Sequence, residues 1–277
     1  MYISLKYRLI KFLEKIPFLQ MIIYNNLRFL KFLLPHDKDY LGLKILFNLD
    51  ENRTFVDVGG NIGISSMSFR QMGYKKNEIL IFEPDKDLIK KHLNRLKNYY
   101  SKLIIFPFGL SNKNQSKVLH KAEYKNLLIH LNNSFSKKYI LDKIKNNYPK
   151  IYKDFNYKQK IYSLKKFDDI KYKKDICFIK IDVEGYDHLV IEGMKNYLKK
   201  HKPIFLVEFN RSNFLDIWKN LKKNYFCYSF NVEKNCFNKF SNEKILRLIS
   251  GHIFDKIYNK NSINLFLIPK KFKFKKN

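Results

Sequence analysis

The tract TFVDVGGNIG, residues 54–63, runs from an apolar strand through three glycines into a helical stretch. A strand, a glycine turn and a helix in this order are typical of the first unit of a parallel sheet, where ligands bind at the strand's carboxyl end. Gly59 and Gly63 allow a tight turn and a close approach to a ligand, because glycine has no Cβ. Asp57 can orient this loop or accept a hydrogen bond from a ligand amine. We therefore expect a small-molecule site here.

The spacing of the glycines narrows the choice of ligand. The dinucleotide pattern G-x-G-x-x-G, begun at Gly59, would need glycine at positions 61 and 64, where Asn61 and Ile64 stand instead. A phosphate loop of the form G-x-x-x-x-G-K-[ST] is also missing from this tract. The loop thus disfavours NAD and a nucleoside triphosphatase, and we count Gly60 and Asn61 among its cofactor contacts.

From Thr54 onward, short apolar strands alternate with helical stretches, which predicts a parallel sheet with helices on both faces. We expect strands at 54–58, 79–82, 103–106, 176–181 and 204–209, and helices near 62–72, 86–98, 186–199 and 213–222. NYFCYSF and SINLFLIP add two further strands near the C-terminus. The fold class is therefore α/β, doubly wound and Rossmann-like, with a mainly parallel sheet.

Three segments depart from this alternation. Residues 1–50 read as an N-terminal helical extension, in which apolar steps of three or four over residues 2–34 predict two amphipathic helices parted near Pro17. Residues 121–160 are rich in Lys, Asn and Tyr without a clear period, which predicts an insertion that carries substrate recognition. The main domain then spans 51–270, and 271–277 form a basic tail.

The net charge of +30 comes from 48 Lys and only 7 Arg, so it is weak evidence for a particular partner. We expect no specific nucleic acid, because Arg is the better bidentate reader and is scarce. Residues 1–34 carry six basic groups and one acid, Glu14, which permits contact with a membrane surface. A helix that covers the sheet, or a subunit contact in an oligomer, is the alternative for this segment.

Other features of the composition bear on location. No stretch reaches the roughly 18 uninterrupted apolar residues that a membrane-spanning helix needs. The N-terminus shows no small-residue cleavage site of a signal peptide, and the three cysteines form no C-x-x-C pair. We therefore expect a cytoplasmic protein, with peripheral contact to the membrane as an option.

Polar groups follow the second and third strands. The second strand ends in IFEPD, where Glu83 stands twenty residues after Gly63 and is placed to receive both ribose hydroxyls of a cofactor. Pro84 follows it in the predicted cofactor site. The third strand leads to FPFGLSN, where Ser111 and Asn112 suit packing and hydrogen bonding to an adenine edge.

The fourth strand runs from a nearly continuous apolar stretch into Asp182, Glu184, Asp187 and His188. Acids gathered at the end of a buried strand are costly unless they are used, so this end is the candidate catalytic centre. Asp182 adjoins the cofactor and is counted among its contacts as well. Glu208 ends the fifth strand, where it contacts substrate or bonds backbone amides.

The tracts VDVGGNIG, FEPD, GLSN, IKIDVEGYD and FLVEFN, in this order and spacing over about residues 54–210, resemble the FkbM family of S-adenosylmethionine (SAM)-dependent methyltransferases. The resemblance implies a class I methyltransferase fold, with seven strands of which the last is antiparallel, and SAM as cofactor. It also implies an O-methyltransferase that acts on hydroxyls of sugars, glycans or natural products. The chain has Gly60 where the family commonly has Ala, and Asp187 where it has Glu.

Methyl transfer to an alcohol needs alignment of the reacting atoms and a base for the hydroxyl proton. Asp182, Glu184 and His188 are the candidates, and for His188 a helix-surface position is the alternative. A divalent cation held by Asp182, Glu184 and Glu208 is conceivable, because clustered carboxylates suit Mg²⁺, but we predict no metal. Two other functions stay open: an RNA methyltransferase, supported only by basicity, and a non-catalytic module with a SAM-binding fold.

Overall fold

The computed structural model describes residues 35, 37–49, 52–124, 127–128, 133–172, 174–211, 213–250 and 264–274 of the chain. The helices expected in residues 2–34 lie outside this part, as do residues 275–277 of the expected basic tail. Within the described ranges, no helix is long and apolar enough to cross a membrane.

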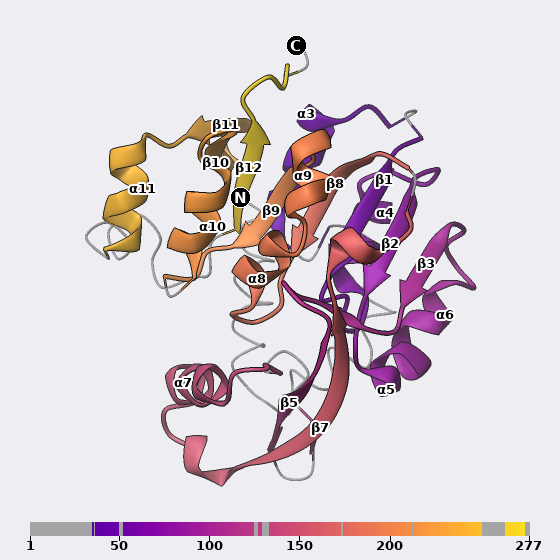
Figure 1. The fold of residues 1–277 in the computed structure, drawn as a ribbon, viewed down its shortest axis with the longest axis vertical. Helices are drawn as coiled ribbons and strands as arrows, with labels where there is room; N and C mark the ends of the chain where they lie inside the picture. Colours follow the sequence, from indigo (N-terminus) through magenta and orange to yellow (C-terminus); the bar gives the residue numbers. More distant parts are fainter. Residues whose placement is uncertain are drawn as a thin grey trace.

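The centre of the protein is an eight-stranded sheet with the order β11-β10-β12-β9-β8-β1-β2-β3 (Figure 1). Its strands are β1 (Thr54–Val58), β2 (Glu78–Phe82), β3 (Leu103–Phe106), β8 (Ile176–Ile181), β9 (Ile204–Glu208), β10 (Tyr225–Asn231), β11 (Cys236–Lys239) and β12 (Asn264–Pro269). The run β9-β8-β1-β2-β3 is parallel, whereas β12 is antiparallel to both of its neighbours. The sheet confirms the predicted fold class and the antiparallel last strand. It has one strand more than expected, because β11 pairs antiparallel with β10 at the edge.

Helices cover both faces of this sheet. One face carries α3 (Leu43–Leu46), which follows a 3₁₀ helix at Lys38–Gly42, and α4 (Ile64–Gln71). The same face carries α5 (Lys86–Leu88) and α6 (Asn94–Leu96), which a π-helical segment at Ile89–Leu93 joins. The other face carries α8 (Asp187–Glu192), α9 (Lys195–Lys200), α10 (Phe214–Leu221) and α11 (Asn242–Ile249). The alternation in β1 explains the two cores, because Phe55 packs on the first face and Val56 and Val58 on the second.

The helix expected over 186–199 is interrupted and forms α8 and α9. The interruption falls at Gly193, where the chain passes against the backbone of Ser111. A Cβ on Gly193 would lie 2.0 Å from the carbonyl oxygen of Ser111, so this approach requires glycine.

A second sheet forms where the sequence predicted no regular element. β5 (Gln115–Tyr124) pairs antiparallel with β7 (Phe155–Lys165), and β4 (Gly109–Leu110) and β6 (Leu127–Leu128) complete the order β4-β7-β5-β6. The pairing runs from Gln115 with Leu164 to Tyr124 with Phe155, so the paired strands extend beyond the expected insertion of 121–160 on both sides. We call this antiparallel pair of β5 and β7 the hairpin, although β6 and α7 lie between the two strands in the sequence.

The hairpin carries a helix, α7 (Lys137–Asn147), on a small core of its own made of Ala122, Ile140, Ile144, Tyr148 and Phe155. Ser136 caps the helix by accepting from the backbone N–H of Tyr139. Figure 1 shows the hairpin and α7 beyond the ends of the parallel strands, the edge of the sheet at which ligands bind in such folds.

Candidate active site

The glycine loop after β1 is closely packed against the loop after β8. Gly59 has a φ of 83°, and a Cβ at this position would lie 2.1 Å from the carbonyl oxygen of Asp182. Gly63 also has a positive φ, of 86°, at the start of α4. The loop therefore leaves bare backbone beside the predicted catalytic acids, as a cofactor that binds through backbone contacts requires.

Glu83 is buried at the end of β2 and tied to both neighbouring loops. Its Oε2 accepts from the backbone N–H of Asn61 at 2.8 Å, and its Oε1 accepts from that of Asp85 at 2.8 Å. Burial raises the pKa of Glu83 to about 7 against the opposing effect of these two hydrogen bonds. Each oxygen keeps a lone pair, so the carboxylate can still receive two vicinal hydroxyls.

Asp57 lies fully buried beneath the glycine loop. Its Oδ2 accepts from the hydroxyl of Ser66 in α4 at 2.8 Å, and its Oδ1 lies 3.7 Å from Nζ of Lys180. Both contacts connect β1 to its neighbours inside the protein. This placement favours the loop-orienting role for Asp57 over a contact with a ligand amine.

The sequence analysis did not single out Lys180, which lies between Asp57 beneath the glycine loop and Asp182 after β8. Its Nζ lies 3.2 Å from Oδ2 of Asp182, in addition to its contact with Asp57. Burial opposes the charge, but the two carboxylates raise the pKa of Lys180 above its usual value. A lysine inside the apolar strand ICFIKI was the available signal, because Lys is rarely buried unless it is paired.

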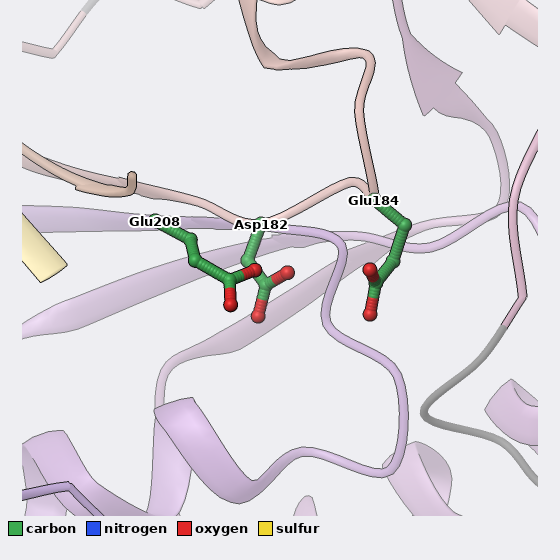
Figure 2. Close-up of side chains that lie close together, drawn as sticks. All are labelled: Asp182, Glu184 and Glu208. Atoms are coloured by element: carbon green, nitrogen blue, oxygen red, sulfur yellow. The ribbon is translucent and has the colours of Figure 1, made fainter. Parts of the chain in front are cut away.

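Asp182, Glu184 and Glu208, which we call the acid cluster, offer carboxylate oxygens that all lie within 4.8 Å of one another. Figure 2 shows the three side chains converging from the loop after β8 and from the end of β9. Burial raises the pKa of Glu184 to about 7 and that of Glu208 to about 8, although Lys143 lowers both. The Asp182 side chain is 39% exposed, which makes it accessible from solvent.

The insertion closes over this cluster from α7. The Lys143 ammonium forms an ion pair with Glu184, and the Ser134 hydroxyl donates to the carbonyl oxygen of Glu184 at 2.8 Å. Glu184 has a φ of 54°, a left-handed conformation that costs a non-glycine residue about 1 kcal/mol or more. The contacts from the insertion hold Glu184 in this conformation, so α7 and its preceding segment belong to the site.

The hydroxyl-bearing ring of Tyr139, also from α7, faces the same cluster. A Cβ on Gly185 would lie 3.0 Å from Cδ2 of Tyr139, so the ring packs directly on the backbone next to Glu184. Burial, then Glu184 and Glu208, raise the pKa of Tyr139 above its usual value. Neither Tyr139 nor Lys143 carried a signal in the sequence, because both stand in a Lys- and Tyr-rich tract without periodicity.

Asp187 and His188 lie at the start of α8 but take no part in the acid cluster. Asp187 is buried and accepts from the backbone N–H of Val183 at 3.2 Å and from the Asn213 side chain at 3.0 Å. It therefore orients the loop that bears Asp182 and Glu184. His188 has a buried Nδ1 with no hydrogen-bond partner among the residues that the structure describes, and its predicted catalytic role stays a prediction.

Ser111 and Asn112, predicted as adenine contacts, have their hydrogen bonds within the protein. The backbone N–H of Ser111 donates to the carbonyl oxygen of Lys165 at 2.9 Å, and the Asn112 side chain donates to Glu192 at 2.9 Å. Pro84 packs against Gly109: a Cβ built on Gly109 would lie 3.6 Å from Cγ of Pro84. These residues join β4 to β7 and α8, and their contact with a cofactor stays a prediction.

A family model described as "Methyltransferase FkbM domain" matches residues 57–228, which is more than half of the chain. The chain belongs to the FkbM methyltransferase family. It is therefore a SAM-dependent methyltransferase, as the resemblance in the sequence implied. The comparison with curated proteins found no match.

Solved structures with a similar fold include an FkbM methyltransferase from Methylobacillus flagellatus KT, at 15% identity and a TM-score of 0.46. The alignment covers 78% of this chain and 43% of that one, so the chain spans less than half the length of this relative. A SAM-dependent O-methyltransferase from Thermotoga maritima aligns at 10% identity and a TM-score of 0.42, with 92% of this chain and 73% of that one covered. The family assignment rests on the family model.

The residues of the glycine loop and of β2 fit SAM. The bare backbone at Gly59 suits the amino-acid end of SAM, because no Cβ blocks its approach. The two carboxylate oxygens of Glu83 suit the two hydroxyls of the SAM ribose. The acid cluster would also suit a divalent cation, since Mg²⁺ prefers carboxylate oxygens. Lys143 and Lys180 already contribute a positive charge each to these carboxylates.

Proposed function

We propose that this FkbM methyltransferase transfers the methyl group of SAM to a hydroxyl of a sugar or glycan, such as a surface polysaccharide or a lipid-linked saccharide. The observation that supports this acceptor class is the acid cluster, which offers three carboxylates within 4.8 Å beside the glycine loop. Carboxylates accept hydrogen bonds and donate none when ionised, so they suit a substrate that presents several hydroxyl donors.

The bound donor supplies an electrophilic methyl group and departs as a neutral thioether. Glu83 holds the ribose, and the glycine loop holds the amino-acid end against the loop after β8. Alignment of the acceptor oxygen with the methyl carbon contributes most of the acceleration. Glu184 and Glu208 accept hydrogen bonds from neighbouring hydroxyls of the acceptor and so set its orientation.

Asp182 takes the proton of the acceptor hydroxyl as the new oxygen–carbon bond forms. It is the most suitable base for two reasons: its carbonyl touches the glycine loop, and its side chain is more exposed than that of Glu184, at 39% against 17%. Lys180, with its Nζ 3.2 Å from Oδ2 of Asp182, orients this carboxylate. General base catalysis of this kind contributes roughly 10²- to 10⁴-fold.

The cluster also bears on the RNA alternative. The phosphates that flank a base or ribose acceptor in RNA would come close to the acid cluster, and its ionised carboxylates would repel them. The basic composition of the chain acts over the whole surface and gives no preference at this centre. The site thus favours an uncharged hydroxyl acceptor.

The test is incubation with SAM labelled at its methyl group and, separately, bacterial surface polysaccharide, lipid-linked saccharides and total RNA. We expect label in the saccharides, recovered after acid hydrolysis as an O-methyl sugar. Asp182→Asn should lower this incorporation by about 10²-fold or more while SAM affinity by calorimetry changes less than about twofold. Label in RNA alone would refute the acceptor class, and loss of SAM binding in Asp182→Asn would move Asp182 to the donor site.

A further inference from the structure

The hairpin of the insertion packs on the loop that carries Glu83. Leu164 of β7 packs on Gly109, since a Cβ on Gly109 would lie 2.6 Å from the Leu164 side chain and 3.6 Å from that of Pro84, which follows Glu83. Behind this contact Glu83, Asp85, Lys121 and Tyr162 are all at least 95% buried. We call this contact between the hairpin and the Glu83 loop the seam.

A continuous set of polar contacts crosses the seam. Lys121 of β5 forms an ion pair with Oδ2 of Asp85, and Tyr162 of β7 donates its hydroxyl to Oδ1 of Asp85 at 3.0 Å. The backbone N–H of Asp85 in turn donates to Oε1 of Glu83 at 2.8 Å. The hairpin is therefore joined, through one aspartate, to the residue placed to receive the ribose.

Two carboxyl groups buried this close together cannot both stay ionised without a compensating cation. Burial has the largest effect and raises the pKa of Glu83; the charge of Asp85 raises this pKa further, and the charge of Lys121 lowers it. Asn61 faces Glu83 from the glycine loop with a neutral N–H, and Tyr162 faces the seam with a neutral phenol. Lys160 lies farther out, paired with the exposed Asp87.

The protonation state of Glu83 matters for the donor. An ionised carboxylate accepts on both oxygens and forms stronger, charge-assisted hydrogen bonds with two hydroxyls. A protonated carboxyl presents one donor in place of an acceptor, so it no longer matches a diol that also needs to donate twice.

We propose that Lys121 is a positioning residue for methyl-donor binding: by neutralising Asp85 across the seam, it lets Glu83 meet the donor's ribose as a carboxylate. This inference rests on the ribose role of Glu83 in the proposed function. It means that the insertion serves the donor site through its strands, in addition to the contacts that α7 makes with the acid cluster.

The test measures the affinity of the full chain for S-adenosylhomocysteine and SAM by calorimetry between about pH 6 and pH 9, in the wild type and in Lys121→Met. We expect Kd to rise about tenfold near pH 7 and less than about twofold near pH 9, because Glu83 then ionises in both proteins. For each ligand and pH, the Kd of Lys121→Met is divided by the Kd of the wild type, and this ratio cancels the titration of the ligand itself. Lys158→Met is the matched control, since Lys158 pairs with Glu123 on the same hairpin but is exposed; its ratio should stay near one.

Two further variants separate the explanations. Lys121→Met with Asp85→Asn removes both charges and keeps a helix cap at position 85, so it should fold even if the single variant does not and should bind the donor within about twofold of wild type. Glu83→Gln should weaken donor binding about tenfold or more, from the loss of charge-assisted hydrogen bonds. Weakening by Lys121→Met that is equal at every pH, or that persists in the double variant, would overturn the proposal. A Glu83→Gln protein with unchanged affinity would refute the ribose assignment itself.

Discussion

Nζ of Lys180 lies 3.2 Å from Oδ2 of Asp182, so a buried lysine supports an acid of the acid cluster whose side chain is 39% exposed. The same ammonium group lies 3.7 Å from Asp57, whose side chain is fully buried. One cation therefore compensates Asp57 beneath the glycine loop and Asp182 in the acid cluster. Its removal should affect both stability and turnover.

Lys180→Met should destabilise the protein by about 3–5 kcal/mol, because Asp57 is left as an uncompensated buried carboxylate. Urea denaturation measures the change. Lys174→Met is the matched control, since Lys174 pairs with Glu78 at the surface, and it should cost less than about 1 kcal/mol. Adding Asp57→Asn to Lys180→Met should recover part of the lost stability, and a further loss would contradict this account of the pair.

Gly59→Ala should cost more stability than Gly73→Ala, although both glycines have a positive φ, of 83° and 100°. At Gly73 the new Cβ would meet only the flexible side chain of Leu49, so the cost is the left-handed conformation, about 1 kcal/mol. At Gly59 it would meet the backbone of Asp182 at 2.1 Å, which must shift. We expect SAM binding to weaken in Gly59→Ala alone, and equal effects of the two substitutions would argue against a tight cofactor loop.

Lys143→Met should move the acid limb of the pH–rate profile to higher pH. Lys143 lowers the pKa of Glu184 and of Glu208, so without it these groups keep their protons to a higher pH, by about one unit. The measurement is kcat/KM for the acceptor against pH, with SAM labelled at its methyl group. Lys138→Met, on the exposed face of the same helix, should leave the profile in place. An unchanged limb in Lys143→Met would mean that neither glutamate controls the rate.

Glu208→Gln should stabilise the protein more at about pH 8 than at about pH 5. Burial, with Asp182 and Glu184 nearby, raises the pKa of Glu208 from 4.5 to about 8 in the folded state. The folded wild type therefore holds a proton that the unfolded chain has released, and its stability falls as pH rises between these values. The glutamine variant lacks this loss, so urea denaturation should show a difference on the order of 1 kcal/mol that appears only at the higher pH. Glu233→Gln, at an exposed position, is the control.

Dialysis against EDTA should leave the rate of methyl transfer unchanged. Lys143 and Lys180 already compensate charge in the acid cluster, so the carboxylates do not depend on a cation to coexist. Inductively coupled plasma mass spectrometry of the dialysed protein verifies that metal is gone. A loss of activity that Mg²⁺ restores would show that the cluster is a metal site and would overturn this prediction.

The sequence predicted the central sheet well because its strands are buried and nearly continuous in apolar residues. The expected strands 54–58, 103–106 and 176–181 coincide with β1, β3 and β8. The positions of the glycine loop and of the acids could also be predicted, because each follows directly after the end of a strand. The meeting of Glu208 with Asp182 follows from the same rule, since parallel strands place their ends at one edge of the sheet.

The hairpin and its contributions to the site were missed for a physical reason. Lys117 and Lys121 in β5, and Lys158 and Lys160 in β7, interrupt the apolar alternation that marks a strand. Each of these lysines lies at least 35 residues in sequence from its partner, so no local pattern indicates the pairing; the partners are Tyr186, Asp85, Glu123 and Asp87. Lys143 and Tyr139 were missed for the same reason, because only folding of the chain brings α7 to the acid cluster.

The return of β7 alongside β4 has a consequence for how this enzyme could diversify. The strands that contact Asp85 and the helix that contacts the acid cluster are parts of one insertion in the chain, so deleting or exchanging that insertion as a block would disturb the surroundings of Glu83 as well as those of the acids. Replacement of side chains on the face of α7 that meets the acid cluster, such as Tyr139 and Lys143, would alter the surroundings of the acids alone. New acceptors are therefore more readily reached by point changes on that helix than by recombination of the whole segment.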